Sequence, residues 1–189
     1  MQNRKAGGFT LVETMFVVTI AAIGLAIGVP SFSNLMKRNR ITASINEVIT
    51  GFQLARSEAA KRSQPVTVCQ TDSPPSTAAA DIECAPGGDW NIGMIAFVDA
   101  NADGDRDDDD EILFYRGEMP DNIFVNVSDD LADGLTYGAD GFPSALLNAS
   151  QMVFCDEEDD QTRRAVISMS VTGRPATARS MTVSGDLEC

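Results

Sequence analysis

Hydrophobic positions divide the chain into three consecutive segments. Residues 9–29 are apolar and hold one charged side chain, Glu13; residues 30–62 are apolar on one side only; and short apolar runs fill the rest. At the rise of an α-helix the 21 residues from 9 to 29 span roughly 31 Å, about the hydrocarbon thickness of a bilayer. We therefore predict a transmembrane helix over residues 9–29.

The second segment has the pattern of an amphipathic helix. Its apolar residues recur at steps of three and four, at Ile41, Ile45, Val48, Phe52, Ala55 and Ala59. Such a stripe requires a globular surface to cover it. Pro30 removes one backbone donor and is expected to kink the helix rather than end it, whereas Pro65 marks its end. A helix over residues 9–62 would be about 80 Å long.

The third segment, residues 63–189, has the texture of β-structure. Short runs rich in Val, Ile, Phe and Thr are separated by clusters of Gly, Pro, Asn and Asp, at 66–70, 90–98, 111–118, 123–127, 134–138, 150–155, 164–171 and 181–184. These runs predict antiparallel strands. The expected fold is α+β, with the long N-terminal helix packed on one antiparallel sheet domain, in one layer or two.

The charge pattern around the apolar run predicts its orientation. Arg4 and Lys5 precede the run, and the next basic residue is Lys37. The leader, residues 1–8, should therefore stay cytoplasmic while the rest is exported, in a single pass. A secretory signal peptide would instead need a small-residue cleavage motif after the run, and only a weak one is present.

Glu13 is the candidate functional residue of the span. An ionisable group inside a bilayer is costly and usually faces a partner. Two interpretations are open. Glu13 pairs with a cation from a neighbouring molecule, or its carboxylate reaches the nearby cytoplasmic interface.

The start of the chain carries a resemblance. Gly8-Phe9-Thr-Leu-Val-Glu13, followed by an apolar run that ends at Pro30, resembles the class III signal of type IV pilins and type II secretion pseudopilins. The resemblance implies that a prepilin peptidase cuts between Gly8 and Phe9 and methylates the new amino terminus of Phe9. The resemblance also makes Glu13 and Pro30 assembly residues. For Glu13 the physical reason is that the amine created by the cut can pair with the Glu13 carboxylate of a neighbour.

Later phrases narrow the resemblance to the GspH/FimT family of minor pilins and pseudopilins. They are GFQLARSEAAKRSQPVTVC at 51–69, IAFVDANADGD at 95–105, TYGADGFPS at 136–144 and VISMSVTGRP at 166–175. The resemblance implies the pilin fold and a structural subunit of a filament, or of its tip, in type II protein secretion or type IV pilus biogenesis. Implied partners are other pilins, bound through the N-terminal helix, the prepilin peptidase and an inner-membrane assembly platform. The implied location is the bacterial inner membrane, with a periplasmic domain that enters a periplasmic or surface filament.

The four cysteines, Cys69, Cys84, Cys155 and Cys189, all lie in the segment predicted to be exported. An even number in an oxidising compartment favours two disulfides, for which three connectivities exist. We choose the sequential pairs Cys69–Cys84 and Cys155–Cys189. A zinc site is the alternative, but the spacings do not fit it and the chain has no histidine.

Net charge disfavours nucleic acid as a partner. Residues 63–189 hold 25 of the 28 acidic residues and 6 of the 14 basic ones, a net charge of 6 − 25 = −19, which repels polyanions. DNA-uptake members of the family resembled here contact DNA through a Gly-Arg-x-Arg sequence. This chain has Gly173-Arg174-Pro175-Ala176 instead. The DNA-binding hypothesis therefore depends on a basic patch formed by Arg163, Arg164, Arg174 and Arg179.

The densest acidic segment, residues 99–111, suggests a further hypothesis. Oxygen-bearing side chains alternate there, with a glycine in sixth place, as at the start of a calcium-binding loop. The candidate calcium ligands are Asp99, Asn101, Asp103, Asp105 and Asp110. Against this hypothesis, the segment joins two strands, and such clusters are common in solvated hairpin turns. A membrane-anchored calcium-binding domain is thus one alternative function, and a DNA-binding minor pilin is the other.

Catalysis is not expected. We find no histidine, no glycine-rich phosphate loop and no nucleophile motif in the sequence. The sequence analysis therefore favours an assembly subunit that needs no cofactor, unless the acidic loop holds calcium.

Overall fold

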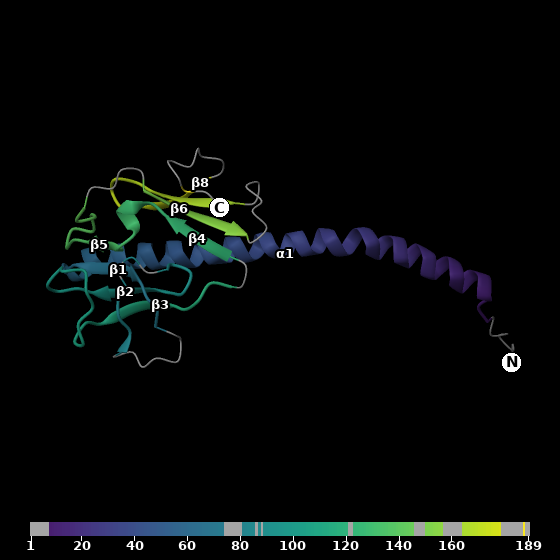
Figure 1. The fold of residues 1–189 in the computed structure, drawn as a ribbon, viewed down its shortest axis with the longest axis horizontal. Helices are drawn as coiled ribbons and strands as arrows, with labels where there is room; N and C mark the ends of the chain where they lie inside the picture. Colours follow the sequence, from purple (N-terminus) through teal and green to yellow (C-terminus); the bar gives the residue numbers. More distant parts are fainter. Residues whose placement is uncertain are drawn as a thin grey trace, which may run out of the picture. The chain divides into compact units, whose positions relative to one another are not determined.

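The structure is a computed structural model that describes residues 8–73, 81–85, 87, 89–120, 123–145, 150–156, 164–178 and 187. The chain divides into two compact units, Met1–Asn39 and Arg40–Cys189. One helix, α1 (Leu11–Arg62), contributes to both units (Figure 1). It passes through Pro30 without ending, as the sequence predicts.

Local signals explain where α1 begins and ends. At the start, the hydroxyl of Thr10 accepts a hydrogen bond from the backbone N–H of Glu13 at 3.3 Å, which satisfies one of the unpaired donors of the first turn. At the end, Lys61 and Arg62 place positive charge in the last turn, where the helix dipole favours it. Ser63 then adopts a positive φ of 54°, two residues before Pro65.

Within the second unit the described strands form two antiparallel sheets of four strands each. The first sheet has the order β3-β2-β1-β5 and the second β4-β6-β7-β8. The first consists of β1 (Val66–Gln70), β2 (Met94–Val98), β3 (Ile112–Arg116) and β5 (Leu135–Tyr137), and the second of β4 (Ile123–Val127), β6 (Gln151–Asp156), β7 (Ala165–Met169) and β8 (Pro175–Ala178). A short 3-10 helix, Asp129–Leu131, joins β4 to β5. The α+β fold with an antiparallel sheet domain is confirmed, and the domain has two sheets.

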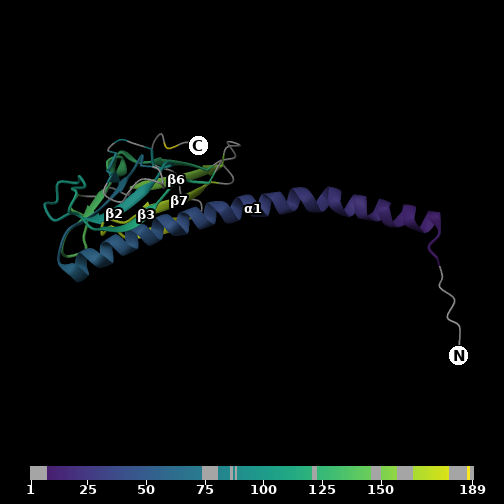
Figure 2. The ribbon, with the colours of Figure 1, turned by 90° about the horizontal axis from the view of Figure 1, so that it is seen from below.

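The core forms where the second half of α1 meets both sheets. All six residues of the predicted stripe are buried, none more than 5% exposed, and they share one hydrophobic cluster with residues from both sheets. In Figure 2 this part of the helix lies along one side of the strands. Helix and sheet approach so closely at Gly51 that an added Cβ would lie 2.3 Å from Met94 Cε. The amphipathic pattern therefore predicts the packing face correctly.

One strand differs from the sequence prediction. The structure has β8 at Pro175–Ala178, whereas the predicted run 181–184 lies outside the described residues. Strand β8 has the sequence Pro-Ala-Thr-Ala, which lacks the large β-branched and aromatic residues that mark a strand. It can still pair because it is an edge strand with proline at its first position.

Two links join distant parts of the second unit. Cys69 of β1 forms a disulfide with Cys84, which closes the loop that follows β1. Tyr137 of β5 donates a hydrogen bond from its hydroxyl to the carbonyl of Gly173 at 2.6 Å, so it connects the first sheet to the turn between β7 and β8. Burial raises the pKa of the Tyr137 hydroxyl, so this group remains a donor well above neutral pH.

The Cys69–Cys84 disulfide should contribute measurably to stability. We expect the double variant Cys69→Ala with Cys84→Ala to lose about 3 kcal/mol of unfolding free energy, because the open loop is free to explore more conformations in the unfolded chain. Denaturant-induced unfolding, followed by the fluorescence of Trp90, measures this loss. Equal stability of the variant and the wild type would contradict the expectation.

Candidate functional site

The first candidate site is the segment that begins at Gly8. Gly8 and Phe9 precede the helix in exposed, non-helical backbone, and the Phe9 side chain is 80% exposed. The bond between them is therefore accessible to a peptidase. Glu13 lies in the first turn of α1, where a carboxylate is favoured by the helix dipole.

Sequence analysis missed the role of Thr10. The Thr10 hydroxyl caps the helix, with Glu13 three residues later, which is the spacing of a capping box. The pattern Thr-x-x-Glu before an apolar run could have revealed it. It fixes the start of the helix one residue after Thr10, so Glu13 is helical and its side chain projects from the first turn.

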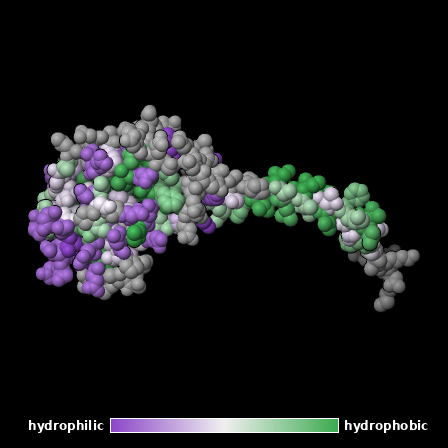
Figure 3. Space-filling view, viewed as in Figure 1, coloured by the Kyte–Doolittle hydropathy of each residue, from purple (hydrophilic) through white to green (hydrophobic). Residues whose placement is uncertain are grey.

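The apolar surface beyond Glu13 is uncovered. The helix is long and apolar enough to cross a membrane over Leu11–Val29, and none of that stretch is buried. Its large side chains are between 59% exposed at Val17 and 77% at Leu11, and they appear as the green surface of the helix in Figure 3. Each such side chain gains roughly 1.5–3 kcal/mol when it leaves water. This surface therefore requires lipid or the helices of other molecules.

Within that surface the carboxylate of Glu13 is exposed and forms no ion pair with any described residue. In a bilayer it would be a lone charge among apolar side chains. The segment thus combines a large uncovered apolar surface with one carboxylate that forms no ion pair with a described residue.

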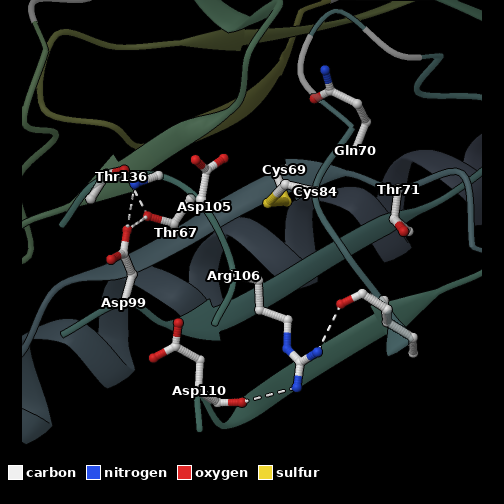
Figure 4. The surroundings of a disulfide bond; sticks show 12 residues. Thr67, Cys69, Gln70, Thr71, Cys84, Asp99, Asp105, Arg106, Asp110 and Thr136 are labelled. Atoms are coloured by element: carbon white, nitrogen blue, oxygen red, sulfur yellow. Dashed lines mark hydrogen bonds between the residues drawn. A yellow bond between two sulfur atoms is a disulfide. The ribbon is translucent and has the colours of Figure 1, made fainter. Parts of the chain in front are cut away.

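The acidic loop between β2 and β3 is the second candidate site, and the calcium hypothesis is not supported there. Asp99 is fully buried, and its carboxylate accepts hydrogen bonds from the Thr67 hydroxyl at 2.7 Å and the Gly104 N–H at 3.1 Å. It serves as the internal anchor of the turn. Figure 4 shows Asp99 beside Thr67, and Asp105 and Asp110 apart from it.

The side chains of three other proposed ligands, Asn101, Asp103 and Asp110, form hydrogen bonds within the turn. The Asn101 amide donates to Asp103 at 2.8 Å, the Asp103 carboxylate accepts from the Asp105 N–H at 3.0 Å, and Asp110 accepts from the Asp107 N–H at 2.9 Å. Side chains of these types commonly fold back on nearby backbone in turns. Among the residues that the structure describes, no group of three or more acidic, cysteine or histidine side chains could hold a metal ion.

Two arginines hold the acidic loop in place. Arg106 donates to the Ile82 carbonyl at 2.9 Å, which ties the loop to the segment beside Cys84 (Figure 4). Arg62, at the end of α1, pairs with Glu58 at 2.6 Å and with Glu111 through both of its terminal nitrogens. These hydrogen bonds from Arg62 lower the pKa of both carboxyl groups, and Lys61 adds to the effect at Glu58. The C-terminal end of α1 and the acidic loop are therefore joined by the ion pair between Arg62 and Glu111.

Of the four arginines proposed for DNA binding, the structure describes Arg164 and Arg174, and these two lie at opposite ends of β7. Arg163 and Arg179 lie outside the described residues. Arg164 precedes β7, whereas Arg174 lies in the turn that follows it, so a strand of five residues, roughly 16 Å long, separates them. Arg174 instead lines a cleft with Arg56 of α1, a neighbour that the sequence does not reveal.

The cysteine predictions have separate outcomes. The structure contains the Cys69–Cys84 disulfide. Cys155 is disulfide-bonded, but its expected partner, Cys189, lies outside the described residues, so the pair Cys155–Cys189 stays a prediction.

Comparisons with known proteins agree with the N-terminal segment and the helix-on-sheet fold described above. Residues 44–173 match the family described as Type II transport protein GspH, and residues 3–29 match the Prokaryotic N-terminal methylation motif. A search of curated proteins found no match. Among solved structures, the type IV minor pilin FimU of Pseudomonas aeruginosa, strain PAO1, is similar in two crystal forms. In space group P21 the identity is 18%, the match covers 77% of this chain and 92% of that one, and the TM-score is 0.53. In space group P65 the identity is 17%, the match covers 73% of this chain and 92% of that one, and the TM-score is 0.49.

The N-terminal signal and the helix-on-sheet fold define the class as type IV pilin-like proteins. Because the family match covers most of its length, this chain belongs to the Type II transport protein GspH family. It is a minor pseudopilin or minor pilin, a structural subunit of filaments in type II secretion or type IV pilus biogenesis. The family and the fold are those of structural proteins.

The charge network around Arg62 predicts a pH dependence. The carboxyl pKa values of Glu58 and Glu111 are lowered in the folded protein, so their contribution to stability is present above the unfolded value of about 4.3 and is lost as the pH falls through the lowered values. We expect Arg62→Ala to lower the melting temperature at neutral pH, and the difference from wild type to shrink at about pH 3.

Thermal unfolding of both proteins across this pH range measures the effect. Lys61→Ala is the matched control, because Lys61 contacts Glu58 but not Glu111, and it should change the melting temperature less. A difference between Arg62→Ala and wild type that is constant with pH would contradict the assigned network.

Proposed function

We propose that this subunit is anchored in the bacterial inner membrane by residues 9–29, with residues 1–8 as a cytoplasmic leader and the β domain in the periplasm. The uncovered apolar helix Leu11–Val29 is the observation that carries the proposal. Arg4 and Lys5 in the leader support the orientation, since basic residues stay on the cytoplasmic side.

Processing follows at the accessible bond between Gly8 and Phe9. Hydrolysis of this bond releases the leader and leaves an α-amine on Phe9, which is protonated in large part near neutral pH. N-methylation of that amine retains its charge. The mature chain then begins with a cation placed only four residues before the Glu13 carboxylate.

The two charges favour assembly between molecules. In an isolated span each charge loses hydration, at a cost of several kcal/mol. When spans pack side by side, the ammonium of one subunit pairs with the Glu13 carboxylate of the next, and the apolar side chains exchange lipid for protein. Helix packing supplies most of the contact area, and the ion pair selects the register between neighbours.

The same proposal names the partners. Other pilins or pseudopilins contact the N-terminal helix, the prepilin peptidase acts on residues 8 and 9, and an inner-membrane platform extracts the processed subunit from the bilayer. The filament that results is periplasmic or on the cell surface. The family match supports these assignments.

Glu13→Ala tests the assembly step. We expect this variant to insert into the membrane and to be processed normally, but to be absent from filaments, because it cannot pair with the amine of a neighbour. Immunoblots of membrane and sheared filament fractions measure incorporation. Thr14→Ala is the matched control, because its hydroxyl bonds only the Leu11 carbonyl of its own helix, and it should be incorporated as wild type.

Normal incorporation of Glu13→Ala would contradict the pairing mechanism and favour an interfacial role for the carboxylate.

The cleavage step has its own test. Mass spectrometry of the mature protein from cells should show a chain that begins with N-methylated Phe9, and a Gly8→Leu variant should retain residues 1–8 because the bulkier side chain blocks the peptidase. A mature wild-type chain that begins at Met1, or after residue 29, would overturn the proposal.

A further inference from the structure

An open cleft of about 420 Å³ lies beside the second half of α1. One wall is the helix, with Gln53, Arg56, Ser57 and Ala60; the other is formed by Asp140 and Gly141 after β5, and by Arg174 and Pro175 at the start of β8. Three segments that are distant in sequence thus converge on it, all within the second unit. Two of its lining residues are arginines.

Arg56 is held at the cleft by two contacts. Its Nε donates to the carbonyl of Gly141 at 3.0 Å, and its guanidinium lies 5.9 Å from the centroid of the Phe142 ring. The turn itself cannot shift easily, because Gly141 has a positive φ of 74° and packs so closely on the helix that a Cβ would lie 3.2 Å from that of Ala60. The hydrogen bond to Gly141 uses Nε, so the terminal nitrogens of Arg56, which bond no described residue, can donate to a ligand.

Arg174 is placed from the opposite wall. Its backbone is fixed in the turn between β7 and β8, since its N–H donates to the Ser170 hydroxyl at 3.1 Å and its carbonyl accepts from the Ser170 N–H at 3.1 Å. Its side chain is exposed and forms no hydrogen bond or ion pair with any residue that the structure describes. A fixed turn therefore presents a guanidinium that pairs with no residue in the described part of the chain.

We propose that this cleft binds an acidic segment of a neighbouring filament subunit, with the guanidiniums of Arg56 and Arg174 holding its carboxylates. Charge complementarity argues for this occupant. Asp140 lines the cleft with these two arginines, but its carboxylate accepts a hydrogen bond from the Phe142 N–H at 3.0 Å, and neither arginine forms an ion pair with a residue that the structure describes. Arginine forks match carboxylates in geometry, and such charge-assisted hydrogen bonds are the stronger ones.

The shape of the cleft suits a peptide that approaches from the side of α1. The cleft runs beside exposed residues of α1, Gln53 and Ser57, and α1 is the element through which the proposed function has subunits assemble. Phe142, which is 49% exposed next to Arg56, offers apolar surface to the same segment. A nucleic acid would present phosphates to the same arginines. The negative field of the domain opposes both ligands, and it opposes the nucleic acid more because that ligand carries a charge at every phosphate along its length.

The inference depends on the filament role of the protein and not on the pairing of Glu13. Glu13→Ala protein should therefore bind an acidic peptide as well as wild type does, so a failure of one proposal is distinguishable from a failure of the other.

The test uses the full chain in detergent and a fluorescent peptide with the sequence of residues 103–111, DGDRDDDDE, as the acidic probe. Binding is followed by fluorescence anisotropy. We expect Arg174→Ala to weaken binding roughly ten- to a hundredfold, as for the loss of a charge-assisted hydrogen bond, and added salt to weaken it further. Arg164→Ala is the matched control, because Arg164 does not line the cleft, and it should bind as wild type.

Three results would overturn the proposal. They are no binding at millimolar peptide, equal binding by wild type and Arg174→Ala, and unchanged binding of a peptide in which every Asp and Glu is replaced by Asn and Gln. A DNA duplex that binds more tightly than the peptide, and loses affinity in Arg174→Ala, would assign the cleft to phosphates instead. Thermal unfolding of Arg174→Ala as wild type will show that any loss of binding does not come from misfolding.

Discussion

The proposed assembly depends on one carboxylate, Glu13, that lies unpaired in an uncovered apolar surface. Nothing within the described chain buries the helix over Leu11–Val29, and Glu13 lies in its first turn without a cation. A surface of this kind is unstable in water, and its carboxylate is unstable in lipid. In the proposed assembly, both difficulties end because identical or related spans pack together and each supplies an amine to the next. In this proposal the N-terminal half of α1 is covered by other molecules.

The second half of the same helix solves the opposite problem. From Ile41 to Ala59 its apolar stripe is buried in the chain's own core, so the globular domain remains folded whether or not the subunit is assembled. The Cys69–Cys84 disulfide, the Tyr137 hydrogen bond to Gly173 and the Arg62 network join the loops to this core. One continuous helix thus links a self-sufficient domain to a segment that requires partners.

Sequence patterns predict the elements that depend on local order. The stripe from Ile41 to Ala59 follows from helical periodicity, and its burial is confirmed. Glu13 stands out by its isolation among apolar residues, and its pairing stays a prediction. Strand β8 was missed because an edge strand is defined by its neighbour rather than by its own small residues. Asp99 was predicted as a ligand because the sequence shows a carboxylate in an acidic run. The sequence does not show that the Thr67 hydroxyl, on a distant strand, donates a hydrogen bond to that carboxylate. Arg56 and Arg174 meet only through tertiary packing, which no local pattern records.

The most direct test of the pairing between neighbours is a high-resolution cryo-electron microscopy structure of a filament that contains this subunit. The account predicts that the Glu13 carboxylate lies within ion-pair distance, about 4 Å, of the amino-terminal nitrogen of an adjacent subunit. A Glu13 carboxylate that faces solvent, or that is surrounded only by apolar side chains with the neighbour's amine elsewhere, would contradict it.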